Sequence, residues 1–468
     1  MKIALVQCPA FGIDRPPLAL GYLAAYLRVN NYQTDIFDFN IDLYSRSNDD
    51  EKKFWDFQYV FQWLDKDYFS NQGFLPEEYF RDWAKQITES GCRIAGFSVQ
   101  SSSLRASIKL ASELKRIAPE TVIIFGGPLH LSYSIGHAYH LLQLEQPCGK
   151  KTVDIVAMGE GEQVLVEILN RIKSGSSLDG CQGTVLRENG RIVNNGLCPL
   201  IHDLDCLPFP DFSRFPLGRY KHKNRLPILG SRGCIFRCLF CDDSRMWRTY
   251  RSRTAENIIN EIRIRKEEGV EFLEFNDLLI NGNLLQLSRL CELLIKERLR
   301  INWGGSAVVD KKMDLSFLKK LKEAGCCYLN YGLESGSPKI LREMNKHFKL
   351  AEAKKAIKDT YEAGISVCTN WIVGFPTETE EDFQETINFI RENIRYLKSN
   401  MMVNSFILKG ESLLFQQQEE FGITFDSDGH WKSLDGINTI EERRRRYARL
   451  LDLLSENNDI AAHKTFQG

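Results

Sequence analysis

Two series of short β-branched runs, each run separated from the next by an amphipathic stretch, constrain the fold of this chain most strongly. The first series covers residues 1 to about 190, and the second begins at Pro227. Apolar residues at helical spacing between short apolar runs are typical of βαβ units, which build parallel sheets. The sequence therefore predicts an α/β protein with two parallel sheets in one chain.

The first series predicts a doubly wound, Rossmann-like domain over residues 1–191. Ligands of such open sheets bind at the carboxyl ends of the strands. The aromatic-rich stretch Lys52–Lys85 interrupts the alternation, as a helical insertion or a lid. The clearest helical patterns are Leu18–Val29, Leu104–Ile117 and Glu162–Ile172. The expected strands are Lys2–Gln7, Gln33–Phe39, Arg93–Ser98, Thr121–Phe125 and Asp154–Ala157.

The second series predicts a partial (β/α)6 barrel over residues 227–407, with its chemistry at the carboxyl ends of the strands. A proline-containing stretch without periodicity predicts a linker over residues 192–226. Residues 408–468 form an expected C-terminal region that ends in the amphipathic helix Ile440–Ser455. The expected strands are Pro227–Gly230, Glu271–Phe275, Ile301–Gly304, Tyr328–Gly332, Ser366–Val373 and Met402–Phe406.

Charge and targeting signals narrow the class of protein. The 61 basic and 62 acidic residues leave a formal charge of −1, which gives no general affinity for nucleic acid. The dense basic run Arg443–Arg446 is interpreted as a solvated helix face. The start of the chain lacks signal-peptide features, and no apolar run approaches the ~20 residues of a membrane span. We therefore expect a soluble, cytoplasmic protein.

Three cysteines have the spacing of a metal-binding loop. The reducing cytoplasm favours metal ligands over disulfides among the 13 cysteines of the chain. Cys234, Cys238 and Cys241 form a C-x3-C-x2-C loop directly after the first strand of the second series. Three thiolates can hold three irons of a 4Fe-4S cubane and leave the fourth iron open to an outside ligand. A structural zinc loop is the alternative, but zinc needs a fourth ligand that this loop does not supply.

With this loop at the head of a βα series, the chain resembles the radical S-adenosylmethionine (SAM) superfamily. The resemblance implies that SAM binds the open iron and is cleaved by an electron from the cluster. The run Tyr331–Ser337 resembles the fourth-strand motif of the family, and Trp371–Pro376 resembles its fifth-strand segment. The family's pair of acids after the second strand is here Asn276-Asp277. The residues that the resemblance places near SAM are Phe240, Asp277, Glu334, Ser335 and Gly374.

The first domain resembles the cobalamin-binding domain of B12-dependent radical SAM enzymes. The resemblance rests on Arg15–Ala25, Gly96–Ser103, Phe125–His130 and Met158–Glu162. The chain lacks a D-x-H-x-x-G motif, so cobalt is expected without a histidine ligand, with His130 as the candidate exception. The residues implied to contact cobalamin are Ser98, Ser101, Ser102, Gly126, Gly127, Gly159 and Glu160.

The resemblance implies a methyltransferase that moves a methyl group from SAM through methylcobalamin to an unactivated carbon of a small molecule. The cofactors perform the hard chemistry, so no side chain is assigned as a catalytic acid or base. The expected partners are a small-molecule substrate and an external electron donor such as flavodoxin or ferredoxin. Two alternatives stay open: oxidation, cyclisation or ring rearrangement without methyl transfer, and a cobalamin or iron–sulfur carrier without turnover. Methylthiolation is less favoured, because no second cluster motif is evident.

Overall fold

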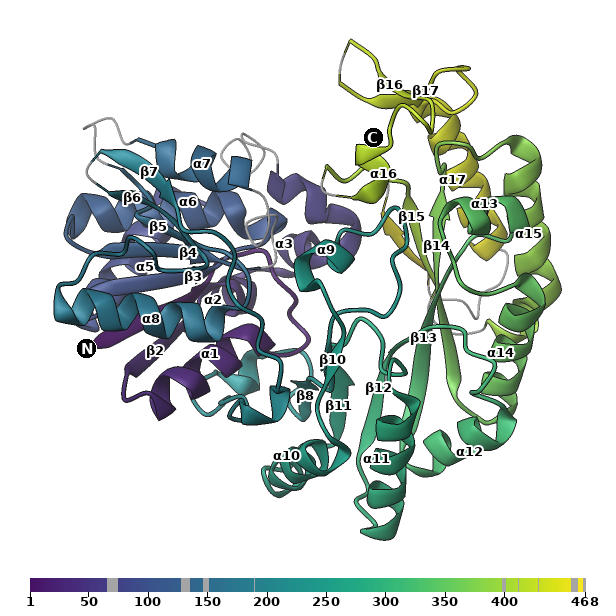
Figure 1. Ribbon diagram of the computed structural model, residues 1–468, viewed down its shortest axis with the longest axis horizontal. Helices are drawn as coiled ribbons and strands as arrows, with labels where there is room; N and C mark the ends of the chain where they lie inside the picture. Colours follow the sequence, from purple (N-terminus) through teal and green to yellow (C-terminus); the bar gives the residue numbers. More distant parts are fainter. Residues whose placement is uncertain are drawn as a thin grey trace. The chain divides into compact units, whose positions relative to one another are not determined.

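The computed structural model describes residues 1–64, 75–127, 135–145, 151–188, 190–397, 401–410, 412–427, 429–455 and 462–465. The chain divides into two compact units, Met1–Lys223 and Asn224–Gly468 (Figure 1). Each unit is built around one seven-stranded sheet.

The sheet of the first unit has the strand order β2-β1-β3-β4-β5-β6-β7. Its first five strands are parallel, and the order 2-1-3-4-5 is one of the two common doubly wound arrangements. The predicted fold class is therefore confirmed. The sequence reasoning missed the antiparallel hairpin β6–β7, because β7 is short and has no fully buried residue. The strands are β1 (Lys2–Gln7), β2 (Gln33–Asp38), β3 (Ile94–Ser98), β4 (Val122–Gly126), β5 (Ile155–Ala157), β6 (Thr184–Glu188) and β7 (Arg191–Asn194).

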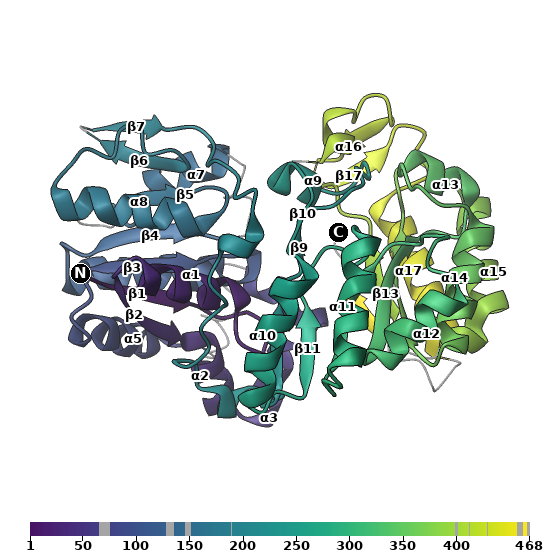
Figure 2. The same ribbon diagram turned by 60° about the horizontal axis from the view of Figure 1, so that its bottom comes forward.

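Helices cover both faces of this sheet. The helices α1 (Leu18–Val29) and α8 (Gly161–Ser174) pack together, and α5 (Glu77–Glu89) packs with α6 (Leu104–Ile117) (Figures 1 and 2). The α5 and α6 side chains share one apolar core with alternate residues of β1. The described part of the aromatic-rich stretch is helical. The remaining helical elements are α2 (Phe39–Arg46), α3 (Asp49–Lys52), η1 (Lys53–Trp55), η2 (Phe57–Leu64), η3 (Ser101–Ser103), α7 (Ile135–Gln143), η5 (Leu204–Cys206) and η6 (Leu217–Arg219).

The segment predicted as a linker packs on the first unit as far as Lys223. The Asp211 backbone N–H donates to the Gly21 carbonyl at 3.0 Å, and the Asp211 carboxylate pairs with Arg28 at 2.5 Å; both partners lie on α1. Phe212 and Tyr220 are buried. Apolar side chains without periodicity therefore anchor this stretch, which is why a search for helical or strand patterns did not detect the packing.

The sheet of the second unit is parallel throughout, with the order β8-β11-β12-β13-β14-β15-β18. Its first six strands follow chain order, as a partial barrel requires, and this prediction is also confirmed. The seventh strand, β18, was not predicted. The strands are β8 (Arg225–Ile228), β11 (Phe272–Phe275), β12 (Asn302–Ala307), β13 (Cys326–Glu334), β14 (Ser366–Val373), β15 (Met401–Ser405) and β18 (Ala462–Thr465).

Helices between the strands cover one face of this sheet (Figure 2). Tyr331 of β13 reaches Thr360 of α14 (Leu350–Glu362), which places Tyr331 and the buried Leu329 and Leu333 toward the helices. Two short antiparallel pairs, β9–β10 and β16–β17, lie outside the sheet. These strands are β9 (Ser231–Arg232), β10 (Arg251–Ser252), β16 (Ile423–Phe425) and β17 (Trp431–Ser433). The helices are α9 (Asp243–Trp247), α10 (Ala255–Glu267), α11 (Leu284–Lys296), α12 (Leu315–Glu323), α13 (Pro338–Glu343), α14 (Leu350–Glu362), α15 (Glu380–Asn393), η7 (Ile394–Tyr396), α16 (Leu413–Gln416) and α17 (Ile440–Ser455).

The basic run on α17 is not a solvated face. Arg443 and Arg446 are 0% and 1% exposed, whereas Arg444 and Arg445 are exposed. The guanidinium of Arg443 stacks 3.7 Å from the Trp431 ring centroid, and that of Arg446 donates to the Glu378 carbonyl at 2.8 Å. The sequence interpretation was wrong because residues three apart share one helix face, and the partners of these two arginines are remote in sequence.

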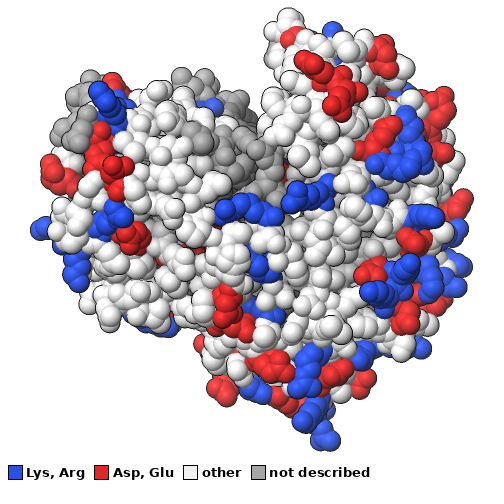
Figure 3. All heavy atoms as spheres, viewed as in Figure 1, with Lys and Arg blue, Asp and Glu red and all other residues white. Residues whose placement is uncertain are grey.

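The surface carries side chains of both charges, as the nearly equal numbers of basic and acidic residues predict. On the face drawn in Figure 3, basic (blue) and acidic (red) side chains alternate over the surface of the second unit. Among the helices that the structure describes, none has the length and apolar character needed to cross a membrane.

Candidate cluster and cofactor site

The cysteine loop follows β8 at the carboxyl edge of the second sheet. Gly233 turns the chain with a φ of 87°, and a Cβ there would lie 2.3 Å from the Thr249 carbonyl oxygen. Only glycine fits this approach. Cys234, Cys238 and Cys241 follow, each half-buried and none in a disulfide. Burial raises the pKa of all three thiols, that of Cys241 to about 12. A metal would offset this effect, because coordination favours the thiolate.

Two remote segments hold the loop in place. The Leu239 N–H donates to the Met344 carbonyl at 3.1 Å, and the Leu239 carbonyl accepts from Leu414 N–H at 2.9 Å. The Asn345 side-chain amide donates to the Arg237 carbonyl at 2.8 Å. These backbone-directed bonds fix the loop on both sides, so the three thiols project from a supported loop rather than a free one.

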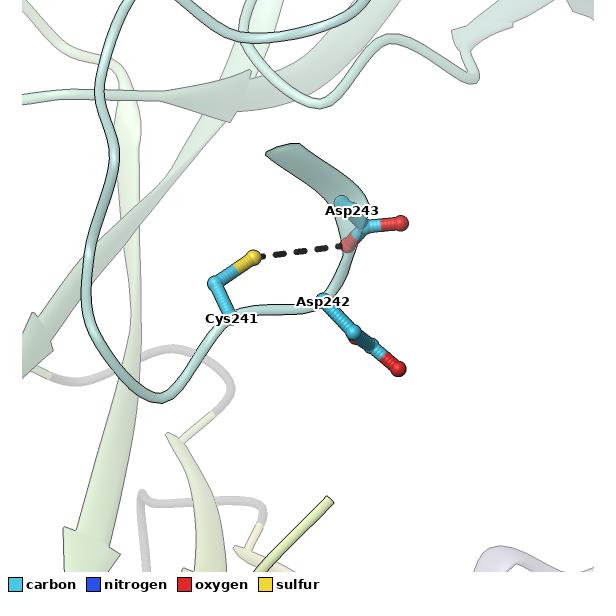
Figure 4. Close-up of side chains that lie close together, drawn as sticks. All are labelled: Cys241, Asp242 and Asp243. Carbon is cyan, nitrogen blue, oxygen red and sulfur yellow. Dashed lines mark hydrogen bonds between the residues drawn. The ribbon is translucent and has the colours of Figure 1, made fainter. Parts of the chain in front are cut away.

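Acidic residues follow the third cysteine. The Cys241 thiol donates to Asp243 at 3.7 Å, while the Asp242 side chain points away from that thiol (Figure 4). Ligand atoms of Cys241, Asp242 and Asp243 all lie within 4.8 Å of one another. Lys409 donates to Asp242 at 2.9 Å, so the charge of the buried Asp242 is compensated. The sequence reasoning did not single out these acids or Lys409.

Asp277 is positioned against the base of the cysteine loop. Its carboxylate accepts from Gly230 N–H at 2.8 Å and from the Ser231 hydroxyl at 2.6 Å. Burial raises its pKa to about 7, although these hydrogen bonds oppose the shift. Asp277 thus fixes the strand end that leads into the loop. Its predicted contact with SAM stays a prediction.

Glu334 ends β13 in a strained conformation. Its φ of 67° lies in the left-handed region, and the register with β14 shifts between Gly332 and Glu334. Such backbone strain costs of order 1–3 kcal/mol in a non-glycine residue and is concentrated at functional sites. The Glu334 carboxylate accepts from Lys346 Nζ at 3.0 Å. Lys346 Nζ also lies 5.4 Å from the Phe240 ring centroid, so the structure brings Glu334 and Phe240 to the same lysine.

Ser335 and Gly374 are tightly packed by the protein itself. The Ser335 hydroxyl lies 3.2 Å from the Thr386 hydroxyl and accepts from Ser337 N–H at 3.1 Å. Gly374 has a φ of 84°, and a Cβ there would lie 2.4 Å from Arg443 Cγ. The need for glycine at position 374 therefore has an explanation in packing against α17, and a ligand contact at either residue stays a prediction.

The carboxyl edge of the first sheet carries the serine and glycine loops predicted for cobalamin. Ser102 donates to the Ala10 carbonyl at 2.8 Å, which ties the loop after β3 to the loop after β1. Ser98 is half-buried at the end of β3, and Ser101 is exposed. Gly127 has a φ of 126°, and a Cβ there would lie 2.3 Å from the Val99 carbonyl oxygen. The Ser102–Ala10 contact lies at the switch point of the doubly wound sheet, between β1 and β3, where ligands of this fold bind.

Gly159 and Glu160 pack against the end of the first unit. Gly159 has a φ of 95°, and a Cβ there would lie 2.9 Å from Cys198 Cβ. The buried Glu160 carboxylate accepts from Ile201 N–H at 2.7 Å. Gly126 is less constrained, since the nearest atom to a Cβ there would be at 3.6 Å. His130, the candidate cobalt ligand, lies outside the described residues.

The donor set of the cysteine loop fits an iron–sulfur cluster. Thiolates are the usual protein ligands of such clusters, and three supported, half-buried thiols lie within eight residues of one loop. The partly exposed edge of the first sheet offers close backbone approach and hydroxyl groups, which suits a large flat ligand. The residues present therefore fit both predicted groups.

Comparisons with known proteins agree with this geometry. Residues 228–390 match the model of the radical SAM superfamily. An uncharacterized methyltransferase of Pyrococcus horikoshii is 28% identical over 84% of this chain and 78% of its own length. An anaerobic magnesium-protoporphyrin IX monomethyl ester cyclase of Cereibacter sphaeroides is 29% identical over 62% of this chain, which spans about half (48%) of that relative.

The solved structures extend the likeness to nearly the whole chain. The radical SAM methyltransferase TsrM from Kitasatospora setae, solved with cobalamin and a 4Fe-4S cluster, superposes with a TM-score of 0.68 at 15% identity. The match covers 95% of this chain and 85% of that one. At this identity the likeness concerns the fold, and it includes both units.

Proposed function

The chain is a radical SAM enzyme with the fold of the cobalamin-dependent members, and we propose that it is a methyltransferase. It transfers a methyl group from SAM, by way of cobalamin, to an unactivated carbon of a small molecule. The observation that carries this proposal is the supported loop of Cys234, Cys238 and Cys241, with the Glu334–Lys346 pair beside it.

The residues of the second unit bind the cluster and orient SAM. The three cysteines would hold the cluster, and three protein ligands would leave one iron available to SAM. When bound, the cluster supplies one electron to SAM and cobalamin carries the methyl group. Glu334 and Asp277 position SAM, and Phe240, Ser335 and Gly374 border it. Asp277 acts from the base of the loop, because its carboxylate is anchored to Gly230 and Ser231.

The first unit holds cobalamin at the carboxyl edge of its sheet. Gly126, Gly127 and Gly159 border the corrin ring, and close packing against Val99 and Cys198 holds the backbone at Gly127 and Gly159 in place. The hydroxyls of Ser98 and Ser101 bond the ring substituents, and Ser102 and Glu160 shape the edge through their own internal hydrogen bonds. The described residues of this edge thereby offer backbone surface and hydroxyl groups to the cofactor.

The partners and location follow from the same chemistry. The substrate is a small molecule rather than nucleic acid, and a flavodoxin or ferredoxin supplies the electron in the cytoplasm. The balanced charge of the chain supports this assignment, since electrostatic capture of nucleic acid requires a basic surface.

The test is anaerobic reconstitution with iron, sulfide and hydroxocobalamin, followed by dithionite, methyl-deuterated SAM and candidate substrates. We expect bound cobalamin, 5′-deoxyadenosine and a product that is heavier by a deuterated methyl group. A product that has lost hydrogen or changed its ring, without label, would instead assign the oxidation or cyclisation alternative. Bound cofactors with no nucleoside product would assign a carrier, and Cys238→Ala would then leave its function unchanged.

A further inference from the structure

Lys346 is a largely buried cation beside the cysteine loop, and the binding of a cluster by three thiols does not by itself require it. Its side chain is 11% exposed. The ammonium group donates to Glu334 Oε1 at 3.0 Å and to the Gly332 carbonyl at 3.0 Å, and it lies 5.4 Å from the Phe240 ring centroid. Two hydrogen bonds therefore fix the positive charge between the end of β13 and the cysteine loop.

The segment around Lys346 is joined to the cysteine loop on both sides. The Met344 carbonyl accepts from Leu239 N–H, and the Asn345 side chain donates to the Arg237 carbonyl. The His347 ring stacks on Phe236 at 4.6 Å between centroids. Lys346 lies in the middle of this segment, so its backbone is held beside the loop, and its own two hydrogen bonds hold the ammonium group.

The charge of Lys346 acts on the cysteines. It lowers the pKa of the Cys234 and Cys238 thiols against the larger, raising effect of burial. In turn, although burial lowers the pKa of Lys346, Glu334 and the Cys238 and Cys241 thiols raise it above its ordinary value. These directions agree with the geometry, in which the ammonium group lies beside Phe240, the residue between Cys238 and Cys241.

A purely structural role explains this arrangement poorly. A buried ion pair such as Glu334–Lys346 adds little net stability, because the cost of desolvating both charges offsets their attraction. Lys409, a second cation near the loop, is directly neutralised by Asp242, and Asp243 adds a further acid on that side. Lys346 is likewise paired with Glu334, but its ammonium group also lies 5.4 Å from the ring centroid of Phe240, which stands between Cys238 and Cys241 in the loop.

We propose that Lys346 is a positioning residue that raises the reduction potential of the cluster held by Cys234, Cys238 and Cys241. The inference rests on the proposed function, since it requires the cluster. Reduction moves one electron from a low-potential donor to the cluster, oxidises the donor by one electron and breaks no bond. With three thiolate ligands the cluster changes its net charge from −1 to −2. A fixed positive charge nearby stabilises the more negative state, and iron–sulfur potentials respond to such charges.

The test is a redox titration of the reconstituted protein without SAM, followed by electron paramagnetic resonance, with iron and sulfide counted in every sample. Lys346→Met and Lys346→Gln should lower the midpoint potential, so that at a fixed solution potential the ratio of reduced to oxidised cluster falls about fivefold or more. Lys346→Arg should retain the wild-type potential. Glu334→Gln removes a negative charge and should shift the potential in the opposite direction. Lys354→Met, which removes an exposed lysine of α14 paired with an exposed glutamate, is the matched control and should change nothing.

Opposite signs at Lys346 and Glu334 are the signature of an electrostatic role. Equal potentials in wild type and Lys346→Met, at full iron content, would overturn the proposal, and so would shifts of the same sign at both positions. Failure of both neutral variants to assemble a cluster that the Arg variant assembles would assign Lys346 to folding and also overturn it. A wild-type protein without a cluster would instead refute the proposed function itself.

Discussion

The carboxyl edges of the two sheets are built from different kinds of residue. At the edge of the second sheet, thiols and charged side chains project from supported loops, and Lys346 and Asp277 each make two hydrogen bonds there. At the edge of the first sheet, glycines and serines bring backbone segments close together, as at Gly127 and Ser102. The edge of the first sheet therefore depends on close backbone packing, and the edge of the second depends on thiols and charged groups. Different substitutions should therefore impair the two edges.

The largest effect is expected from removal of a thiol. Cys238→Ala should abolish cluster assembly and reduce 5′-deoxyadenosine formation by ~100-fold or more, because two thiolates cannot hold the cubane. Cobalamin binding should persist, since it depends on the other unit. The measurements are iron content, nucleoside product by mass spectrometry and cobalamin absorbance. Cys206→Ser, at an exposed thiol of the first unit, is the control. Loss of cobalamin from Cys238→Ala would show that the two edges are not independent.

At the edge of the first sheet, one added methyl group should be enough to weaken both stability and cobalamin binding. Gly127→Ala forces a Cβ to 2.3 Å from the Val99 carbonyl at a φ of 126° and should cost about 2 kcal/mol of unfolding free energy. Cobalamin affinity should fall about tenfold as the backbone shifts. Gly126→Ala, whose Cβ meets nothing closer than 3.6 Å, should cost less than about 0.5 kcal/mol. Urea unfolding and cobalamin titration measure both quantities, and equal destabilisation by the two variants would contradict this account of the edge.

A pH dependence should mark the edge of the second sheet. The pKa of Asp277 is raised by burial from its ordinary value of 3.8 to about 7. A raised carboxyl pKa means that the unfolded state releases its proton first, so the contribution of Asp277 to stability is lost as pH rises toward 7. Between pH 5.5 and 7.5, wild type should lose about 2 kcal/mol relative to Asp277→Asn. Urea unfolding of both proteins across this pH range measures the sign of the difference. If the unfolding free energies of the two proteins change in parallel with pH, the raised pKa of Asp277 is refuted.

The smallest effects are expected from single hydroxyls of the first edge. Ser101→Ala removes an exposed group and should leave stability unchanged while weakening cobalamin binding about threefold. Ser102→Ala removes the bond to the Ala10 carbonyl and should cost about 1 kcal/mol of unfolding free energy. If Ser102→Ala weakened cobalamin binding and Ser101→Ala lowered stability instead, Ser102 rather than Ser101 would face the ligand.

The sequence predicted most of the fold because apolar periodicity decides where strands and helices lie. The helices Leu18–Val29 and Leu104–Ile117 and the strand Ser366–Val373 have the predicted bounds. Short edge strands carry too few apolar residues for such a signal, which is why β7 was missed. Burial of Arg443 and Arg446 was also missed, since the Trp431 and Glu378 partners become neighbours only in the folded chain.

The candidate site was predictable where a local motif carries it. The spacing of the three cysteines is visible in the sequence, and so is the run that ends at Glu334. Lys346 belongs to no motif: its meaning depends on contacts with Glu334 and with the loop more than a hundred residues earlier. The i, i+3 spacing of the buried arginines was the one available signal that the sequence reasoning did not use.

The most direct test of the central claim is the fate of the methyl group and the nucleoside in one reconstituted sample. The protein is loaded with cobalamin and a 4Fe-4S cluster and reduced with dithionite in the presence of methyl-deuterated SAM. We expect the labelled methyl group to appear on cobalamin and 5′-deoxyadenosine to form in the same sample. A cluster-loaded protein that cleaves SAM but neither retains nor methylates cobalamin would contradict the central claim.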